Sequence, residues 1–375
     1  MIRFMTAGES HGPCLTAIID GFPSGLAVNL NEINYELSRR QGGYGRSHRQ
    51  NIERDEIEIL GGILYGQTTG APISLRINNR DWANWRERWS SGELPVLRVP
   101  RPGHADYAGM KKYNLQDARL VLERASARET AARVAVGALA KQLLAKFDIL
   151  VGSYVTSIGK VEADIPALSQ PELWEMAENS NVRCPLVDAS ERMRAAIDEA
   201  RRAKDTLGGI FTVSAVGLPV GLGTYVQWDR RLDARLAAAV MSIHAVKGVE
   251  IGPAFENARM SGTSVHDDLF PGIKGKVVRY TNRAGGLEGG MTNGEPLLVR
   301  AAMKPISTTG LAHQSVDLFS GEAAAPEYQR SDICAVPAAA VIGEAMVSWT
   351  LAEALDEKFG GDSLAEKLRC RKTSS

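Results

Sequence analysis

The chain holds little cysteine and no membrane-length hydrophobic run. Only four of its 375 residues are cysteine, and no two of them have the CxxC spacing of a zinc-ligand pair. Cysteines so far apart argue against a disulfide framework and are typical of a protein from a reducing compartment. The apolar runs fall short of the roughly 18 residues that a membrane helix needs, and the first residues lack the apolar core of a signal peptide. We therefore expect a cytoplasmic protein with no metal site and no membrane contact.

The chain also has no excess of charge of either sign. Lysine plus arginine number 44, and aspartate plus glutamate number 44, so the formal net charge is zero. Proteins that bind nucleic acid usually carry a basic excess, so we expect no nucleic-acid partner. Hydrophobic residues make up 44% of the chain and charged residues 23%, which is ordinary for a folded globular protein.

The spacing of the apolar residues predicts a mixture of helices and strands. Strands are expected where apolar residues alternate or form short runs bounded by turns, at residues 15–20, 57–64, 71–77, 209–217 and 295–302. Helices are expected where apolar residues recur at helical spacing, at residues 31–40, 130–147, 190–204 and 338–359. A glycine-bounded turn joins the second and third strands, which predicts an antiparallel hairpin.

Two of the expected helices begin at recognisable capping residues. Asn31 is a candidate N-cap for the first helix. Ser126 and Glu129 have the spacing of a capping box before the helix at 130–147. Small residues on one face of that helix, such as Gly137, predict that it packs closely within a core.

Two histidines stand in short loops that contain glycine. The loops read Gly8-Glu9-Ser10-His11-Gly12 and Arg101-Pro102-Gly103-His104-Ala105-Asp106. Loops on a rigid scaffold often carry acid–base groups, and histidine titrates near neutral pH. His11 and His104 are therefore the candidate acid–base residues.

Arginines gather in the chain around these histidines, at positions 39, 40, 46, 49, 124, 128 and 133. Arg124 precedes the helix at 130–147 and Arg128 lies at its start, where a positive charge is unfavourable for the helix dipole. This placement favours a bound anion such as a phosphate. The alternative is a salt bridge from Arg128 to Glu123 or Glu129.

A second basic segment, residues 39–46, contains three glycines between its arginines. It fits two interpretations equally well. One is a solvated basic loop, and the other is a loop that closes over phosphate or carboxylate groups.

Longer motifs resemble one known family. From Gly8 to about Ala345 the chain resembles chorismate synthase, through eight motifs in order: 8–12, 40–46, 101–107, 124–130, 247–252, 285–290, 304–308 and 330–332. The resemblance implies conversion of 5-enolpyruvylshikimate 3-phosphate into chorismate and phosphate by an anti-1,4-elimination, a step of aromatic amino acid biosynthesis. It also implies a requirement for reduced FMN with no net redox change, because an electron-rich flavin can stabilise the electron-poor ring that phosphate loss leaves.

The resemblance also implies roles for individual residues. His11 protonates the leaving phosphate, and His104 stabilises the anionic flavin near N1. Ser10 and Asp332 lie near flavin N5 and relay the final proton. Arg40, Arg46 and Arg128 bind the anionic groups of the substrate. In members that bind NADP(H), the same arginines contact it. Flavin contacts come from Arg124, Ala125, Ser126, His244, Ala245, Gly289, Lys304, Pro305, Ile306, Ser307, Thr308 and Arg330, with Lys304 or Arg330 on the FMN phosphate.

Position 244 departs from the family, whose members often carry Asn or Pro there. If only backbone atoms contact the flavin, His244 changes nothing. If the side chain takes part, His244 adds a titratable group beside the cofactor.

The fold implied by the resemblance is α+β, a β-α-β sandwich in which antiparallel sheets enclose central helices. We expect a single large domain over residues 1–366 and a disordered tail over 367–375. The resemblance further implies a homotetramer and an external flavin reductase that supplies reduced FMN, because the match occupies nearly the whole chain.

Two functions of other classes compete with this interpretation. One is a phosphate-ester lyase or hydrolase that uses the histidines and arginines without flavin. The other is a catalytically silent protein that binds flavin or an anion. A requirement for reduced FMN during turnover distinguishes chorismate synthase activity from both alternatives.

Overall fold

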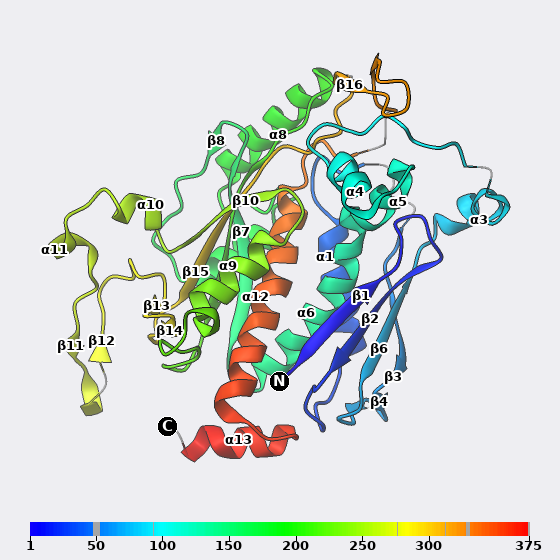
Figure 1. Ribbon diagram of the computed structural model, residues 1–375. Coiled ribbons are helices and arrows are strands. Elements are labelled where there is room, and N and C mark those ends of the chain that lie inside the picture. Colours follow the sequence, from blue (N-terminus) through cyan, green and yellow to red (C-terminus); the bar gives the residue numbers. More distant parts are fainter. Residues whose placement is uncertain (48–52, 93, 276, 312, 328–330, 374–375) are drawn as a thin grey trace.

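Two antiparallel sheets with helices between them form the centre of the computed structural model (Figure 1). The structure describes residues 1–47, 53–92, 94–275, 277–311, 313–327 and 331–373. One sheet has the strand order β1-β2-β6-β3, and the other has the order β10-β15-β9-β7-β8. All pairings within both sheets are antiparallel. The predicted mixture of helices and antiparallel strands is confirmed.

The four-stranded sheet consists of β1 (Arg3–Ala7), β2 (Cys14–Asp20), β6 (Ile73–Asn78) and β3 (Ile57–Gly61). Strand β6 pairs with β3, so the predicted hairpin is confirmed. Alternate residues Ile73, Leu75 and Ile77 are buried, because successive side chains of a strand point to opposite faces of the sheet.

The five-stranded sheet consists of β10 (Val246–Ile251), β15 (Leu297–Met303), β9 (Gly209–Val216), β7 (Leu150–Ile158) and β8 (Val161–Glu162). Strands β9 and β15, both predicted, pair with each other along their lengths. In β15 the buried residues again alternate, with Leu297, Val299 and Ala301 facing the core.

Three helices lie between the sheets: α1 (Leu30–Gln41), α6 (Thr130–Ala145) and α12 (Val336–Phe359). Helix α6 packs on β2 and β6, whereas α12 packs on β7 and β9, and the two helices pack on each other. The apolar face of each sheet is thus covered by helix. All three helices were predicted from apolar spacing to within a few residues.

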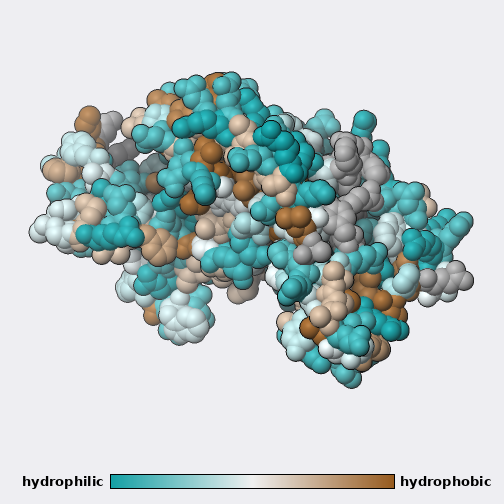
Figure 2. Space-filling model, turned by 90° about the horizontal axis from the view of Figure 1, so that it is seen from above, coloured by the Kyte–Doolittle hydropathy of each residue, from teal (hydrophilic) through white to brown (hydrophobic). Residues whose placement is uncertain are grey.

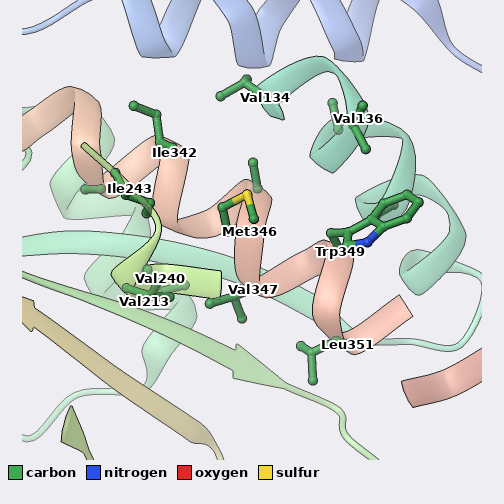
Figure 3. Packing of buried hydrophobic residues seen from close by; sticks show 14 of the residues in the cluster. Val134, Val136, Val213, Val240, Ile243, Ile342, Met346, Val347, Trp349 and Leu351 are labelled. Carbon is green, nitrogen blue, oxygen red and sulfur yellow. The ribbon is translucent and has the colours of Figure 1, made fainter. Parts of the chain in front are cut away.

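Helix α12 is buried all round, which is why its apolar residues show no single face. Ile342, Met346 and Val347 of α12 lie among side chains of α6, β9 and α9 (Figure 3). In the described part of the chain, α12 is the one helix long and apolar enough to cross a membrane by length and composition. Since 94% of its apolar window is buried inside the protein, α12 is a core helix.

Shorter elements surround this centre. The helices are α3 (Trp82–Ser91), α4 (Asp106–Tyr113), α5 (Ala118–Arg124), α7 (Gln170–Glu178), α8 (Val187–Arg202), α9 (Leu232–Met241), α10 (Ala254–Asn257), α11 (Gly262–Val265) and α13 (Leu364–Thr373). The 3₁₀ turns are Ala127–Glu129, Trp228–Arg230 and Ile273–Gly275. Two-residue strands form the pairs β4 (Ile63–Leu64) with β5 (Gln67–Thr68), β11 (Phe270–Pro271) with β12 (Val277–Val278), β13 (Leu287–Glu288) with β14 (Met291–Thr292), and β16 (Ser315–Val316) with β17 (Ala323–Ala324).

Both predicted helix caps need correction. The side chain of Asn29, not Asn31, caps α1 by accepting a hydrogen bond from the backbone N–H of residue 31. Ser126 caps the 3₁₀ turn before α6 through the N–H of Arg128. Glu129 does not complete the capping box, because its carboxylate binds Arg133 and Thr6 instead.

The expected disordered tail is also corrected in part. Residues 364–373 form α13, which begins before position 367. Lys367 is fully buried, and its ammonium group contacts Asp356 at 2.5 Å and donates to the carbonyl of Gly360. A buried lysine needs such a counter-charge, so the helix is anchored to the end of α12.

Gly137 allows α6 and α12 to approach each other closely. A Cβ atom built on Gly137 would lie 2.3 Å from the Cβ of Ala345 and 2.4 Å from its Cα. These distances are below any normal contact, so the predicted small-residue face is confirmed as the contact between the two central helices.

A buried ion cluster joins the same helices. The carboxylate of Glu344 in α12 is 1% exposed and accepts hydrogen bonds from Arg39 of α1, Lys141 of α6 and Arg183. Glu36 and Glu178 neutralise the remaining positive charge. Burial alone would raise the pKa of Glu344, but the surrounding cations hold that pKa below its ordinary value.

Replacement of Gly137 by alanine is expected to destabilise the protein. Alanine is favoured over glycine in a helix by about 1 kcal/mol, but overpacking a core costs about 1–3 kcal/mol, and here the obstacle includes backbone. Gly137→Ala should therefore lower the midpoint of thermal unfolding. The control is Gly61→Ala, where an added Cβ meets no atom within 4 Å. Equal midpoints for the two variants would contradict the packing argument.

Replacement of Glu344 by glutamine is expected to reduce both the stability and its dependence on pH. Removing one partner of a buried ion pair costs about 3–5 kcal/mol. Because the pKa of Glu344 is lowered by folding, its contribution is present above the ordinary glutamate pKa of about 4.3 and is lost as the pH falls below it. Thermal midpoints at pH 7 and pH 3.5 should thus differ less for Glu344→Gln than for the unaltered protein. An unchanged difference would contradict this assignment.

Candidate active site

The loop between β1 and β2, residues 8–13, carries the first candidate histidine. Gly8 has a φ of +111°, and a side chain there would meet the carbonyl oxygen of Cys14 at 2.4 Å, so only glycine fits. Asn79, at the end of β6, donates hydrogen bonds to the carbonyls of Glu9 and Gly12. The neighbouring strand thereby fixes the loop.

His11 is held against a buried carboxylate. Its Nδ1 atom lies 2.9 Å from Oε1 of Glu123, whose side chain is 4% exposed. The ring also stacks on Trp85 of α3, with 4.2 Å between ring centroids and an interplanar angle of 33°. Ser10 lies beside it, buried, and accepts a hydrogen bond of 3.1 Å from the hydroxyl of Ser126.

His104 is held in the same way. Its Nδ1 atom lies 2.5 Å from Oδ1 of Asp106, and Arg101 donates to both oxygens of that carboxylate. Burial would raise the pKa of Asp106, but the hydrogen bonds from His104 and Arg101 keep it below its ordinary value. The carboxylate therefore stays charged at neutral pH.

A helical hairpin brings the two histidines to one end of the molecule. Helices α4 and α5 pack together, with Gly109 against Val121. Asp106 is the first residue of α4, and Glu123 lies in the last turn of α5. The α4–α5 pair lies at one end of the molecule (Figure 1), so the two histidines that are bonded to these carboxylates lie there as well. Seen from that side, the surface is mostly hydrophilic with smaller hydrophobic patches (Figure 2).

The salt bridge considered above as the alternative for Arg128 is not found. Its guanidinium group binds neither Glu123 nor Glu129 but donates to both oxygens of Asp55, at 2.6 and 2.8 Å. Arg40 donates to the same carboxylate at 2.9 Å. Both arginines are buried, and a buried charge needs a close counter-charge.

Burial and the shared ion pairs shift the pKa values of Arg40 and Asp55. Burial, together with repulsion from Arg128 and Arg46, lowers the pKa of Arg40 to about 10 despite the opposing effect of Asp55. The pKa of Asp55 is itself lowered, because the two arginines outweigh its burial. Nη2 of Arg128 is buried without a hydrogen-bond partner among the described residues, and it forms an ion pair with Glu53 at 3.7 Å.

Arg46, at the end of the basic segment, also has a carboxylate partner. Arg46 donates to Oδ2 of Asp332 at 2.6 Å, and the backbone N–H of Ser47 donates to Oδ1 at 2.7 Å. Arg46 lies within electrostatic reach of Arg40. Residues 39–46 are therefore not a fully solvated loop, and their arginines are bound to carboxylates.

Arg124 and its neighbours lie directly behind the histidine loop. Arg124 donates to the carbonyl and hydroxyl oxygens of Thr6 at 3.0 and 2.9 Å. The Thr6 hydroxyl in turn donates to Glu129. Ala125 and Ser126 continue this segment into the 3₁₀ turn, so these three expected flavin contacts lie together.

The segment of residues 304–308 lies beside the His104 loop. The Lys304 ammonium group donates to the carbonyl of Gly103 at 3.2 Å, and Ser307 lies in contact with Gly103. The backbone N–H of Lys304 donates to Ala245, which has a φ of +66°. Pro305, Ile306 and Thr308 follow in this segment, with Ile306 and Thr308 held by hydrogen bonds from Thr206 and Ser331.

Two lysines in this region have no carboxylate partner. Burial and the neighbouring charge of Lys247 lower the pKa of Lys304. Neither lysine forms an ion pair within the described part of the chain. They contrast with Arg40, Arg46 and Arg128, each of which is bound to a carboxylate.

His244 lies among the same groups. Burial lowers the pKa of its imidazole, and Arg133, His104 and Arg124 add to that effect, whereas Glu129 opposes it. Its Nδ1 atom is buried without a hydrogen-bond partner in the described chain. The side chain, and not only the backbone, therefore faces this region.

One expected flavin contact, Gly289, is not brought to these residues. Gly289 lies in the turn between β13 and β14, next to the start of α9 at Leu232. His244 follows the other end of α9, and ten helical residues separate the two by about 15 Å. Arg330 lies outside the described residues.

Three carboxylates of the site, unlike Asp332, were not predicted. Asp55, Asp106 and Glu123 hold the arginines and histidines, yet they are 73, 2 and 112 positions from Arg128, His104 and His11. Only the pair His104 and Asp106, two residues apart, could have been found from sequence spacing. No group of three or more potential metal ligands occurs among the described residues.

Comparison with known proteins identifies the family. The model of the chorismate synthase family matches residues 2–355. A chorismate synthase from Desulforamulus reducens is 53% identical over 372 residues, which cover 98% of this chain and 96% of the relative. One from Rubrobacter xylanophilus is 54% identical over 367 residues, with 97% and 94% covered.

A solved structure agrees with these relatives. A crystal structure of chorismate synthase superimposes with a TM-score of 0.81 at 43% identity, and the match covers 100% of this chain and 97% of that one. The chain belongs to the chorismate synthase family, and it is a lyase of the shikimate pathway that leads to the aromatic amino acids.

Proposed function

We propose that the end of the molecule that holds His11 and His104 eliminates phosphate from 5-enolpyruvylshikimate 3-phosphate and forms chorismate. The observation that carries the proposal is the α4–α5 hairpin, which presents two imidazoles, each on a buried carboxylate, beside several guanidinium groups. An imidazolium can give a proton to a leaving phosphate. Fixed cations can stabilise the charge that develops on that phosphate.

Reduced FMN is the proposed cofactor, and the residues present fit it. Lys247 and Lys304 form a positive pair without a carboxylate, which suits a phosphate group. The orphaned Nδ1 of buried His244 offers a hydrogen-bonding atom at the same place. When bound, reduced FMN supplies electron density to the substrate ring. The further contacts proposed are Arg124, Ala125, Ser126, Ala245, Pro305, Ile306, Ser307 and Thr308, with Arg330.

The residues of the chain divide the remaining work. We assign the proton for the leaving phosphate to His11 and the stabilisation of negative charge on the cofactor to His104. Ser10 and Asp332 are the proposed relay for the ring hydrogen, with Arg46 holding the Asp332 carboxylate in place.

Substrate anions are assigned to the arginines. Arg40 and Arg128 are already bound to Asp55, so an incoming phosphate or carboxylate would join an existing network. Nη2 of Arg128, which has no hydrogen-bond partner among the described residues, offers that anion a donor. NADP(H), if it binds, is proposed to meet the same three arginines, Arg40, Arg46 and Arg128.

We also propose a homotetramer in which copies share sites. Gly289 lies far from His244 within one chain, so its flavin contact would be with a neighbouring copy. Exposed apolar side chains beside it, including Tyr225, Val226 and Trp228, fit a subunit contact. The β-α-β sandwich is the proposed description of the fold, supported by α6 and α12 lying on different sheets and on each other. A cytoplasmic location and an external flavin reductase rest on the sequence alone.

An anaerobic assay tests the proposed reaction. Purified protein with the phosphorylated enolpyruvyl substrate and photoreduced FMN should release chorismate and phosphate in equal amounts. Oxidised FMN with NADPH alone in air should give no turnover, since the reductase is a separate protein.

Three outcomes of this assay contradict parts of the proposal. Phosphate release without flavin would favour a simple lyase or hydrolase. Flavin binding without any turnover would favour a silent binding protein. Aerobic turnover with NADPH would contradict the external reductase.

Two variants should separate proton transfer from binding. His11→Ala should lower kcat by about 10²–10⁴-fold, the usual contribution of general acid catalysis, and leave FMN binding nearly intact.

Arg46→Ala should weaken substrate binding more than flavin binding, because it removes a guanidinium group from the anion site. Steady-state kinetics and flavin titration measure both effects. Unchanged turnover in either variant would refute the role assigned to that residue.

A further inference from the structure

Glu123 makes three hydrogen bonds to the histidine loop. Its backbone carbonyl accepts from the N–H of Ser10 at 3.0 Å. Its carboxylate accepts from the backbone N–H of His11 at 2.8 Å and lies 2.9 Å from Nδ1 of the same residue. A single side chain thus fixes both the backbone and the ring of His11.

These contacts determine which ring nitrogen carries the proton. Oε2 of Glu123 is bonded to a backbone N–H, which can only donate. A carboxylate can only accept, so Nδ1 must carry a hydrogen to bond Oε1. Nε2, on the opposite edge of the ring, is then the nitrogen that can gain or lose a proton.

The position of Glu123 is itself fixed. The residue lies in the last turn of α5, which packs on α4 where Val121 meets Gly109. The face of the His11 ring lies on Trp85. With its edge bonded to Glu123 and its face against an indole, the ring has little freedom to turn.

We propose that Glu123 is a positioning residue that holds His11 in the Nδ1–H form, so that Nε2 delivers the proton to the leaving phosphate. The inference rests on the proposed function, in which His11 is the acid. In that step the proton moves from Nε2 to a phosphate oxygen, while the carbon–oxygen bond breaks with its electron pair on that oxygen. Nδ1–H stays bonded to Glu123, and the ring ends neutral.

The isosteric variant Glu123→Gln tests this most sharply. An amide has one acceptor oxygen and one NH₂ donor, but the His11 backbone N–H and Nδ1–H both need an acceptor. With the amide oxygen on the backbone N–H, the NH₂ group would face Nδ1. Nδ1 would then become the acceptor, and the hydrogen of the neutral ring would move to Nε2.

Two measurements are made on each variant. Solid-state ¹⁵N NMR of protein labelled in its six histidines reports the neutral ring form at pH 8.5, with His11 assigned by its loss in His11→Ala. Anaerobic kinetics with reduced FMN gives kcat and KM. The control Glu58→Gln makes the same change on β3, where the side chain is 49% exposed. Glu123→Asp keeps both acceptor oxygens.

The inference predicts an Nδ1–H form in the unaltered protein and in Glu58→Gln, and an Nε2–H form in Glu123→Gln. In Glu123→Gln, kcat should fall on the order of 10²-fold with KM and the FMN dissociation constant unchanged. Glu123→Asp should keep the Nδ1–H form and recover part of kcat.

An Nδ1–H form that persists in Glu123→Gln, with kcat equal to that of Glu58→Gln, would overturn the positioning role. A change to the Nε2–H form without loss of kcat would instead uphold the effect on His11 and refute its role as the acid. The failure of this inference and the failure of the proposed function are thereby distinguishable.

Discussion

Pairing of buried carboxylates with cations is the interaction on which this structure depends. A buried charge is costly unless a counter-charge and hydrogen bonds accompany it. Glu344 ties together the central helices, and Asp55, Asp106 and Glu123 do the same for the arginines and histidines at one end. Because Asp106, Glu123 and Glu344 lie in packed helices, the cationic groups that they bind have defined positions before any ligand arrives.

The same pairing separates the cations into two kinds. Arg40, Arg128 and Arg46 form ion pairs with Asp55 or Asp332. Lys247 and Lys304 have no such partner in the described chain. We infer that the carboxylate-bound arginines orient the substrate, whose anionic groups join an existing network. Lys247 and Lys304 instead neutralise the phosphate group of a bound ligand. Preorganised charge of this kind costs no rearrangement during the reaction.

Local features of the sequence predicted the three central helices and part of each sheet, but few of the contacts between them. Apolar spacing located α1, α6 and α12 and the strands β9 and β15, and the small residue Gly137 predicted a close helix contact. Asp55 was not recognised as the partner of Arg128, nor Glu123 as the partner of His11, because these pairs join positions 73 and 112 residues apart. No periodicity encodes such a pairing. The disordered tail was wrong because Lys367 finds a buried partner, Asp356, in α12.

A crystal structure of the protein with oxidised FMN and 5-enolpyruvylshikimate 3-phosphate tests the central claim most directly. The account predicts the substrate phosphate on the Nε2 edge of His11, with Nδ1 still on Glu123 and the FMN phosphate at Lys247 and Lys304. Ligands bound away from the α4–α5 hairpin, or a His11 ring turned so that Nε2 faces Glu123, would contradict it.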